Sequence, residues 1–220
     1  MQKKLLTLVL MLIAAINTFA YDFESNGIYY KILSKEKHTC AVTYQSETSG
    51  KEYAGNLVIP STVQDNDGVD YTVSAISGYA FGGCVELQNV VIPNTVTEIG
   101  SDAFSGCSSL SNITFQSGHK ELYLSDYNNE GPLFAECSLD SVFIGRNLTS
   151  KTDVAYIESS PFSKSKMLRS VYVSDSVTYI GKYYFRDCEN LEHVYGMNKV
   201  DSIGEQSFVG TKIKKFCAPS

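Results

Sequence analysis

The sequence predicts a mainly β fold, a solenoid of about six stacked repeats with an N-terminal β-meander cap. Three observations predict it. Phenylalanines recur at nearly constant spacing, an apolar strand pattern follows each of them, and the segment ahead of the repeats shows antiparallel strand signals instead. The composition agrees, since a chain of 220 residues that is 43% hydrophobic is too apolar for disorder. With only 16 Gly and 5 Pro, it is not collagen-like.

A phenylalanine marks each repeat. The series is Phe81, Phe104, Phe134, Phe162, Phe185 and Phe208. Its spacings are 23, 30, 28, 23 and 23 residues, so the two longer repeats are expected to carry insertions, within 116–131 and 149–160. The units that begin at Val90 and Val171 correspond almost position by position, from the apolar start through Ile-Gly to the Phe and a following Cys. Periods of this length are typical of solenoids.

The pattern L-x-x-L-x-L follows each phenylalanine. Its members are Leu87, Val90, Ile92; Leu110, Ile113, Phe115; Leu139, Val142, Ile144; Leu168, Val171, Val173; and Ile213, Phe216, Ala218. The series starts at Leu57 and Ile59, and in the unit at Leu191 a Gly196 replaces the third apolar residue. This is the strand segment of a leucine-rich repeat, in which alternation sends the second and third apolar residues to one face. Such a unit buries that face only when its neighbours stack on it.

The full register, V-x-I-P-x-x-V-x-x-I-G-x-x-A-F-x-x-C-x-x-L, resembles the BspA-type leucine-rich repeats of bacterial surface antigens. The resemblance runs from about Leu57 to Phe216, and the units at 90–110 and 171–191 fit it closely. It implies a leucine-rich-repeat solenoid. Members are similar to secreted or surface-exposed adhesins and binding proteins, and they offer no shared catalytic residues.

The ends of the chain depart from the repeat. Residues 27–33 and 40–44 are predicted strands, and Asp65-Asn66-Asp67-Gly68 is a hairpin signal between Val63 and Tyr71. We therefore expect an N-terminal β cap at 21–56 and a leucine-rich repeat solenoid at 57–220. Residues 214–220 are expected to form a final strand with no cap, whose free edge offers a site for self-association.

Residues 1–20 are predicted to be a signal peptide. Lys3 and Lys4 precede an apolar run from Leu5 to Ile16, and the small residues Thr18 and Ala20 follow. The alternative, a membrane anchor, needs a longer apolar run to span a bilayer. We expect cleavage after Ala20, a mature chain with no transmembrane segment, and secretion by the general export pathway to the periplasm, the cell surface or the extracellular space.

Charge and motif content exclude several function classes. A net charge of -6 and a pI near 5.1 argue against nucleic-acid binding. The histidines His38, His119 and His193 show no metal-ligand spacing, and no nucleophile or phosphate-loop motif occurs. We therefore expect no enzyme activity, catalytic residue, metal or cofactor. Asp65, Asp67 and Asp70 resemble part of a calcium loop, but a hairpin tip explains them better because Gly68 stands where a ligand is needed.

Four cysteines occupy one position of the repeat, three residues after the phenylalanine. They are Cys84, Cys107, Cys137 and Cys188. Ser165 and Thr211 fill the same position, which favours a small buried packing site with free thiols. A Cys84–Cys107 disulfide remains an alternative in an oxidising compartment, because these residues lie in adjacent turns.

The strand positions that face away from the core supply the candidate binding residues. These positions are Val58, Val91, Thr114, Phe143, Tyr172, Tyr195 and Cys217. Three successive aromatics, Phe143, Tyr172 and Tyr195, are predicted to form a ladder flanked by Arg169, His193 and Glu192. Cross-strand aromatic pairs stabilise a sheet, whereas exposed aromatic patches mark interaction sites, and the sequence alone leaves both interpretations open.

These observations favour a secreted or cell-surface, non-catalytic binding or adhesion protein. Its partner is expected to be a protein or a glycan, a host or cell-surface component included, held on the exposed sheet face. One alternative is a solenoid enzyme acting on polysaccharides, which would need carboxylates clustered in one groove. Another is an assembly module that pairs through its uncapped C-terminal strand.

Overall fold

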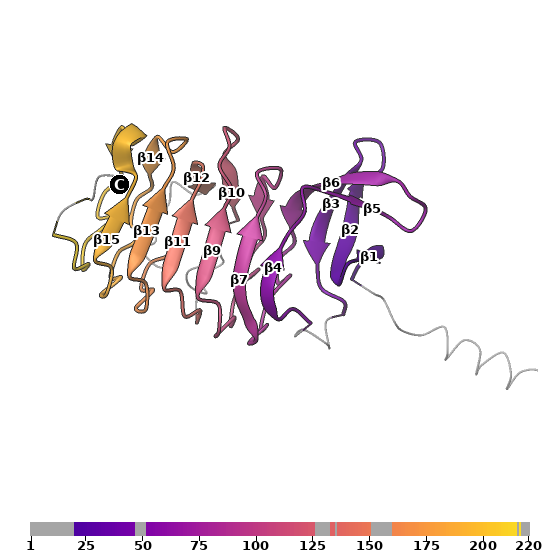
Figure 1. Ribbon diagram of the computed structural model, residues 1–220, viewed down its shortest axis with the longest axis horizontal. Coiled ribbons are helices and arrows are strands. Elements are labelled where there is room, and N and C mark those ends of the chain that lie inside the picture. The colour runs from indigo at the N-terminus through magenta and orange to yellow at the C-terminus, as the bar shows by residue number, and fades with distance from the viewer. Residues whose placement is uncertain are drawn as a thin grey trace, which may run out of the picture.

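The computed structural model describes residues 20–46, 52–125, 133–134, 136–150, 160–214 and 216. Over these ranges the ordered secondary structure is almost entirely strand, and the one described helix is a 3-10 turn, Met197–Lys199. No described helix has the length and apolarity needed to cross a membrane. Figure 1 shows parallel strands stacked side by side along one axis, with the N-terminal strands closing one end. This confirms the predicted leucine-rich-repeat solenoid with a β-meander cap.

One side of the solenoid is a six-stranded parallel sheet. Its strands, in spatial order, are β4 (Gly55–Val58), β7 (Leu87–Ile92), β9 (Asn112–Phe115), β11 (Ser141–Ile144), β13 (Ser170–Val173) and β15 (His193–Tyr195). The L-x-x-L-x-L pattern predicts each of them. Alternation is strict: in β13 the side chains of Val171 and Val173 are buried and that of Tyr172 between them is exposed.

The opposite side carries a longer sheet of mixed direction. Its antiparallel part consists of β1 (Phe23–Ser25), β2 (Ile28–Ser34) and β3 (Thr39–Thr43), and β5 (Thr62–Gln64) pairs with β6 as a hairpin. Its parallel part continues through β6 (Asp70–Ile76), β8 (Glu98–Ile99), β10 (Leu122–Leu124) and β12 (Leu148–Ser150). Further along, β14 (Tyr179–Ile180) and β16 (Ser202–Ile203) form a separate parallel pair.

The cap contains the two predicted strands, β2 and β3, and one strand that the sequence did not indicate, β1. The predicted hairpin is also confirmed, because β5 and β6 pair antiparallel on either side of its tip. The Asp65 carboxylate shapes the tip by accepting hydrogen bonds from the backbone amides of Asp67 and Val69, both at 2.9 Å. Gly68 has a φ of 79°, which is why glycine suits that position.

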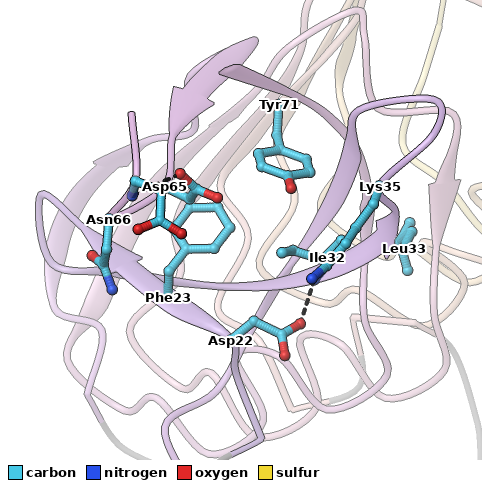
Figure 2. Close-up of a pocket in the computed structure, with 9 residues that line it drawn as sticks. Asp22, Phe23, Ile32, Leu33, Lys35, Asp65, Asn66 and Tyr71 are labelled. Atoms are coloured by element: carbon cyan, nitrogen blue, oxygen red, sulfur yellow. Dashed lines mark hydrogen bonds between the residues drawn. The ribbon is translucent and has the colours of Figure 1, made fainter. Parts of the chain in front are cut away.

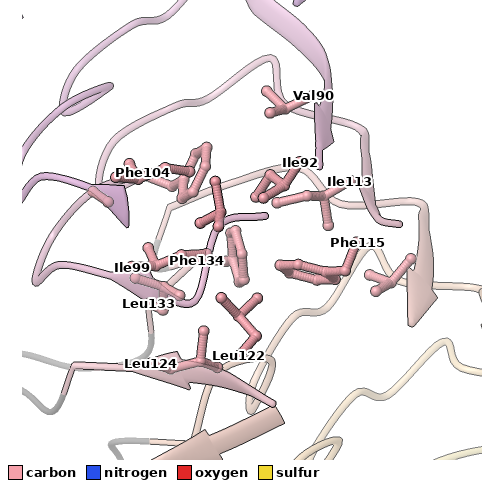
Figure 3. Packing of buried hydrophobic residues seen from close by; sticks show 14 of the residues in the cluster. Val90, Ile92, Ile99, Phe104, Ile113, Phe115, Leu122, Leu124, Leu133 and Phe134 are labelled. Atoms are coloured by element: carbon pink, nitrogen blue, oxygen red, sulfur yellow. The ribbon is translucent and has the colours of Figure 1, made fainter. Parts of the chain in front are cut away.

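A column of phenylalanine rings runs the length of the core. Consecutive ring centroids, from Phe81 to Phe208, lie 4.9, 5.3, 5.2, 5.3 and 5.3 Å apart. Tyr53 starts the column from the cap, 4.9 Å from Phe81. Figure 3 shows Phe104 and Phe134 packed beside strand residues such as Ile92 and Phe115. One ring per repeat therefore fills the same place in every layer, which is the physical reason for the spacing in the sequence.

The glycine of the Ile-Gly pair permits close backbone approach between layers. A Cβ atom at Gly100 would lie 2.4 Å from the backbone nitrogen of Gly78 in the preceding layer. At Gly204 the same atom would lie 2.4 Å from the backbone nitrogen of Lys182. A larger residue at Gly100 or Gly204 would have to push the two layers apart, so glycine suits these two positions.

The repeat cysteines are free thiols that bond to the layer before them. The thiols of Cys107, Cys137 and Cys188 donate to the carbonyls of Phe81, Phe104 and Phe162, at 3.0, 3.2 and 3.1 Å. Cys84, Cys107 and Cys188 are buried, as expected, whereas Cys137 is only partly buried. Cys84 and Cys107 are both free thiols, so the alternative Cys84–Cys107 disulfide is not formed in this structure.

We expect the protein to lose stability as the pH rises above about 9. Burial raises the pKa of Cys84 from 9.0 to about 11 and that of Cys188 from 9.0 to about 12. Between these values the unfolded thiols release protons that the folded thiols keep, so the unfolded state binds fewer protons and the free energy of unfolding falls. Melting temperatures measured between pH 8 and 10 should therefore decrease.

The matched control is Cys188→Ser, because Ser165 fills the equivalent position one repeat earlier. Serine does not titrate in this range, so the variant should show a shallower decrease in melting temperature over the same pH range. An unchanged slope would mean that other groups cause the alkaline loss.

Arg146 is a charged side chain inside the core. It is fully buried, and its guanidinium donates to the carbonyls of Pro93, Asn94 and Val96 at 2.9, 3.0 and 2.6 Å. Burial lowers its pKa from 12.5 to about 10, so the group is protonated at neutral pH. These carbonyls belong to the turn after β7, whereas Arg146 follows β11, and β9 lies between the two strands. The side chain therefore ties together layers that are not neighbours.

The predicted final strand is not formed where the structure describes that segment. Residues 211–214 and 216 adopt no strand, and residues 215 and 217–220 lie outside the described ranges, as does the outward position Cys217. The six-stranded sheet accordingly ends at β15. The Phe216 ring instead packs edge-on against Phe208, with centroids 5.4 Å apart, and stays 46% exposed, so an aromatic contact takes the place of strand pairing here. Residues 1–19 of the predicted signal peptide, residues 126–131 of the first insertion and residues 151–159 of the second also lie outside the described residues.

Candidate functional site

The exposed face of the six-stranded sheet carries the predicted binding residues. The strands pair so that the outward residues form one row across the sheet, in the order Val58, Val91, Thr114, Phe143, Tyr172 and Tyr195. The first half of this row is aliphatic or small and the second half is aromatic. Residues at the same register in neighbouring strands lie about 4.8 Å apart, so the row is continuous.

The aromatic half is a stack of two rings with a third beside it. The rings of Tyr172 and Tyr195 have centroids 5.0 Å apart and an interplanar angle of 12°. Tyr172 is 43% exposed, and Tyr195 is half-buried. Phe143 lies opposite Tyr172 in the adjacent strand and is also half-buried. The sequence thus predicted the positions of all three residues, and ring stacking joins the two tyrosines.

Charged side chains border the stack on one side. Arg169 donates to the Asp140 carboxylate at 2.9 Å, an ion pair between neighbouring repeats in which both side chains are largely exposed. His193 approaches the Glu192 carboxylate at 4.0 Å, and its ring packs on Tyr195 with centroids 5.9 Å apart. Of the three predicted flanking residues, His193 contacts an aromatic ring, whereas Glu192 approaches His193 and Arg169 pairs with Asp140. Sequence reasoning missed Asp140, which occupies the register of Arg169 one repeat earlier.

A second row of side chains is polar and runs parallel to the first. It consists of Asn56, Asn89, Asn112 and Ser141. In each strand this residue precedes the member of the first row by two positions. The Asn89 amide donates to Asn56, the Asn112 amide donates to the Asn89 oxygen at 2.6 Å, and the Ser141 hydroxyl donates to the Asn112 oxygen at 2.5 Å. Aligning the repeats by register would have exposed this amide ladder, because three successive strands carry Asn at one position.

Together the two rows make a surface with separate polar and apolar bands. Each Asn side chain has two N–H donors. The ladder uses one donor of Asn89 and one of Asn112, and Asn112 gives its second donor to the Ser111 hydroxyl. The three Asn residues lie in β4, β7 and β9, whereas the tyrosines lie in β13 and β15, so the amide ladder and the tyrosine stack occupy different parts of the same sheet face. Within the described ranges, no group of three His, Cys, Asp or Glu side chains is placed to hold a metal ion. The chemistry of the surface is hydrogen bonding and apolar contact.

Comparisons with known proteins agree with this architecture. The family described as the BspA type leucine rich repeat region matches residues 74–153 and 130–220, with six copies. The leucine-rich repeat protein of T. pallidum is similar in structure, with 26% sequence identity, a TM-score of 0.55, and coverage of 86% of this chain and 88% of that one. No curated protein matches the chain.

Two further solved structures are more distant. A leucine-rich repeat protein from Bacteroides ovatus has 22% identity and a TM-score of 0.43, and a leucine rich cell surface protein from Faecalibacterium prausnitzii has 21% identity and a TM-score of 0.42. The matches cover 88% and 90% of this chain but only 58% and 54% of those proteins, which are longer. The family match covers most of the repeat region, and the strands place its repeats in the predicted register. The chain belongs to the BspA-type leucine-rich repeat family.

Proposed function

We propose that this protein is an exported, non-catalytic binding protein that holds a partner on the exposed face of its six-stranded sheet. The observation that carries the proposal is the stacked pair Tyr172 and Tyr195, presented on the same sheet face as the polar ladder. Tyrosines that are fixed by stacking contribute apolar area to binding at a small cost in conformational entropy. The signal-peptide pattern at residues 1–20 supports export.

A protein partner fits this surface better than a glycan. A sugar ring packs on the open face of an aromatic ring, but Tyr172 and Tyr195 cover one face of each other. The exposed part of Tyr172 offers both apolar area and a hydroxyl, which suits the mixed apolar and hydrogen-bonding contacts of a protein interface. The Asp140–Arg169 pair forms a polar rim at the border of the aromatics.

The test is a binding screen followed by a double variant. The purified chain is applied to arrays of extracellular proteins and of glycans, and Tyr172→Ala with Tyr195→Ala is then measured on any partner found. Removing two central aromatics from an interface should weaken binding by about 2 kcal/mol or more. The control is Tyr79→Ala, which removes a tyrosine that is 57% exposed and lies outside the sheet.

Affinity that stays the same in the double variant, with native circular dichroism, would contradict the proposal. The tyrosines would then serve only to stabilise the sheet. A partner found only on the glycan array would leave the proposed binding surface in place but contradict the proposal that the partner is a protein.

A further inference from the structure

A cavity of about 490 Å³ lies in the N-terminal cap, outside the six-stranded sheet. Residues at the start of β1, at the end of β2 and at the tip of the β5–β6 hairpin line this open cavity, as Figure 2 shows. The volume suits a small ligand or one long side chain. The cavity is separate from the surface described above, since none of the residues lining it lies in that sheet.

Two buried aromatic rings form the floor of the cavity. Phe23 is 2% exposed and Tyr71 is 4% exposed, and their ring centroids lie 5.8 Å apart. Tyr30 stacks on Phe23 at 5.2 Å, and His38 stacks on Tyr71 at 5.7 Å. Neighbours on both sides therefore hold the floor in place, and the cavity is built before any ligand arrives.

The Tyr71 hydroxyl points into this cavity without a hydrogen-bond partner. Figure 2 shows it directed into the space between Asp65 and Ile32. The residue is almost wholly buried, yet no group among the described residues bonds to the hydroxyl. Burial, followed by the charge of Asp65, raises the pKa of Tyr71, so the phenol is neutral at physiological pH. The hydroxyl at the tip of this nearly buried side chain is therefore available to a ligand in the cavity.

Three carboxylates surround the opening, and their free oxygens have no cation among the described residues. Asp22 accepts from the Ile32 amide at 2.6 Å through one oxygen, and Asp65 uses one oxygen for the hairpin tip. Asp67 forms no ion pair within the described ranges. Lys35 is the single basic residue of the lining, so the cavity carries three negative charges and one positive charge. Such a site attracts cations.

We propose that this cavity binds an organic cation, an ammonium or guanidinium group carried on a short apolar stem. The carboxylates receive the charged N–H groups, and the Tyr71 oxygen accepts one more hydrogen bond. The stem lies on Phe23, Ile32 and Leu33, which give the cavity its apolar side. A lysine or arginine side chain of a peptide and a free alkylamine share this chemistry. A bare metal ion would leave the aromatic floor and most of the volume unused.

The probes are butylguanidinium and its neutral counterpart butylurea, titrated into the purified chain and followed by NMR. Butylguanidinium should shift the backbone amide signals of Ile32 and Asp67, and butylurea should not. Asp65→Asn combined with Asp67→Asn removes two charges but keeps the side-chain oxygen that shapes the hairpin tip. That variant should weaken binding about tenfold or more, and Tyr71→Phe should weaken it about threefold.

Asp70→Asn is the matched control, because Asp70 lies on the same hairpin outside the cavity lining and should leave the affinity unchanged. Three results would overturn the proposal: equal shifts with butylurea, an equal loss in Asp70→Asn, or calcium ions that bind more tightly and displace butylguanidinium. An arginine peptide that binds as well as butylguanidinium would identify a protein source of the cation. The double variant of Tyr172 and Tyr195 should leave this binding unchanged, so failure of this proposal and failure of the proposed function can be told apart.

Discussion

Phe104→Ala is expected to lower the free energy of unfolding by about 3–5 kcal/mol. The Phe104 ring is fully buried, and it packs between Phe81 and Phe134 at centroid distances of 4.9 and 5.3 Å. Alanine would leave a cavity in the middle of the column, and the layers above and below cannot close it because backbone pairing fixes their spacing. Urea denaturation followed by circular dichroism measures the loss.

Tyr172→Ala provides the comparison, since it removes an aromatic from the outside of the same solenoid. The expected loss is nearer to about 1 kcal/mol, because the side chain is 43% exposed and its main contact is the stack on Tyr195. Equal losses in the two variants would mean that the column does not dominate the stability of the core.

Arg146→Met should lower the free energy of unfolding by about 3 kcal/mol. Methionine fills a similar volume but leaves the carbonyls of Asn94 and Val96 without the guanidinium donor, while the Pro93 carbonyl keeps its bond from the Val96 amide. Each buried acceptor without a donor costs about 1–3 kcal/mol. Methionine also removes the desolvation cost of the buried guanidinium, which offsets part of this loss. The free energy of unfolding of Arg146→Lys should lie between those of the wild-type protein and Arg146→Met, because an ammonium cannot present donors in a planar fork to three carbonyls. Urea denaturation again measures the change.

Arg169→Met is the control for the loss of a positive charge. Its ion pair with Asp140 lies at the surface, so the expected change is below about 1 kcal/mol. A stable Arg146→Met protein would show that desolvation of the guanidinium outweighs its hydrogen bonds, and that packing alone holds the turn after β7.

The repeat positions could be predicted because each obeys a local rule. A buried ring at Phe104 recurs in every layer, and the alternation around Tyr172 fixes which side chains face outward. Strand β1 and the conformation of residues 211–214 and 216 follow no such rule. Strand β1 is three residues long and depends on pairing with β2, and Phe216 turns to Phe208 where the repeat pattern predicts an extended chain. Tertiary contacts outweigh local pattern in both places.

The candidate surface was predictable in part, and the cap cavity was not. Phe143, Tyr172 and Tyr195 share one register, so a correct alignment of repeats places them together. The cavity brings Asp22 next to Asp65 and Tyr71. Both lie more than forty residues after Asp22 and share no motif with it. Their proximity depends on how the β5–β6 hairpin lies against β1, and no sequence period encodes that arrangement.

The reach of Arg146 across a whole layer limits how far this solenoid is modular. In a simple repeat array each unit interacts only with its neighbours, so one unit can fray, be deleted or be duplicated without consequence for distant ones. Here the layer containing β9 is enclosed between a turn after β7 and a side chain after β11. We therefore expect these three layers to open together, because the layer of β9 cannot separate until the Arg146 hydrogen bonds break. A chain shortened by the β9 unit would lose the spacing that the guanidinium bridges, so we expect gain or loss of a repeat to cost more stability within this block of three layers than outside it.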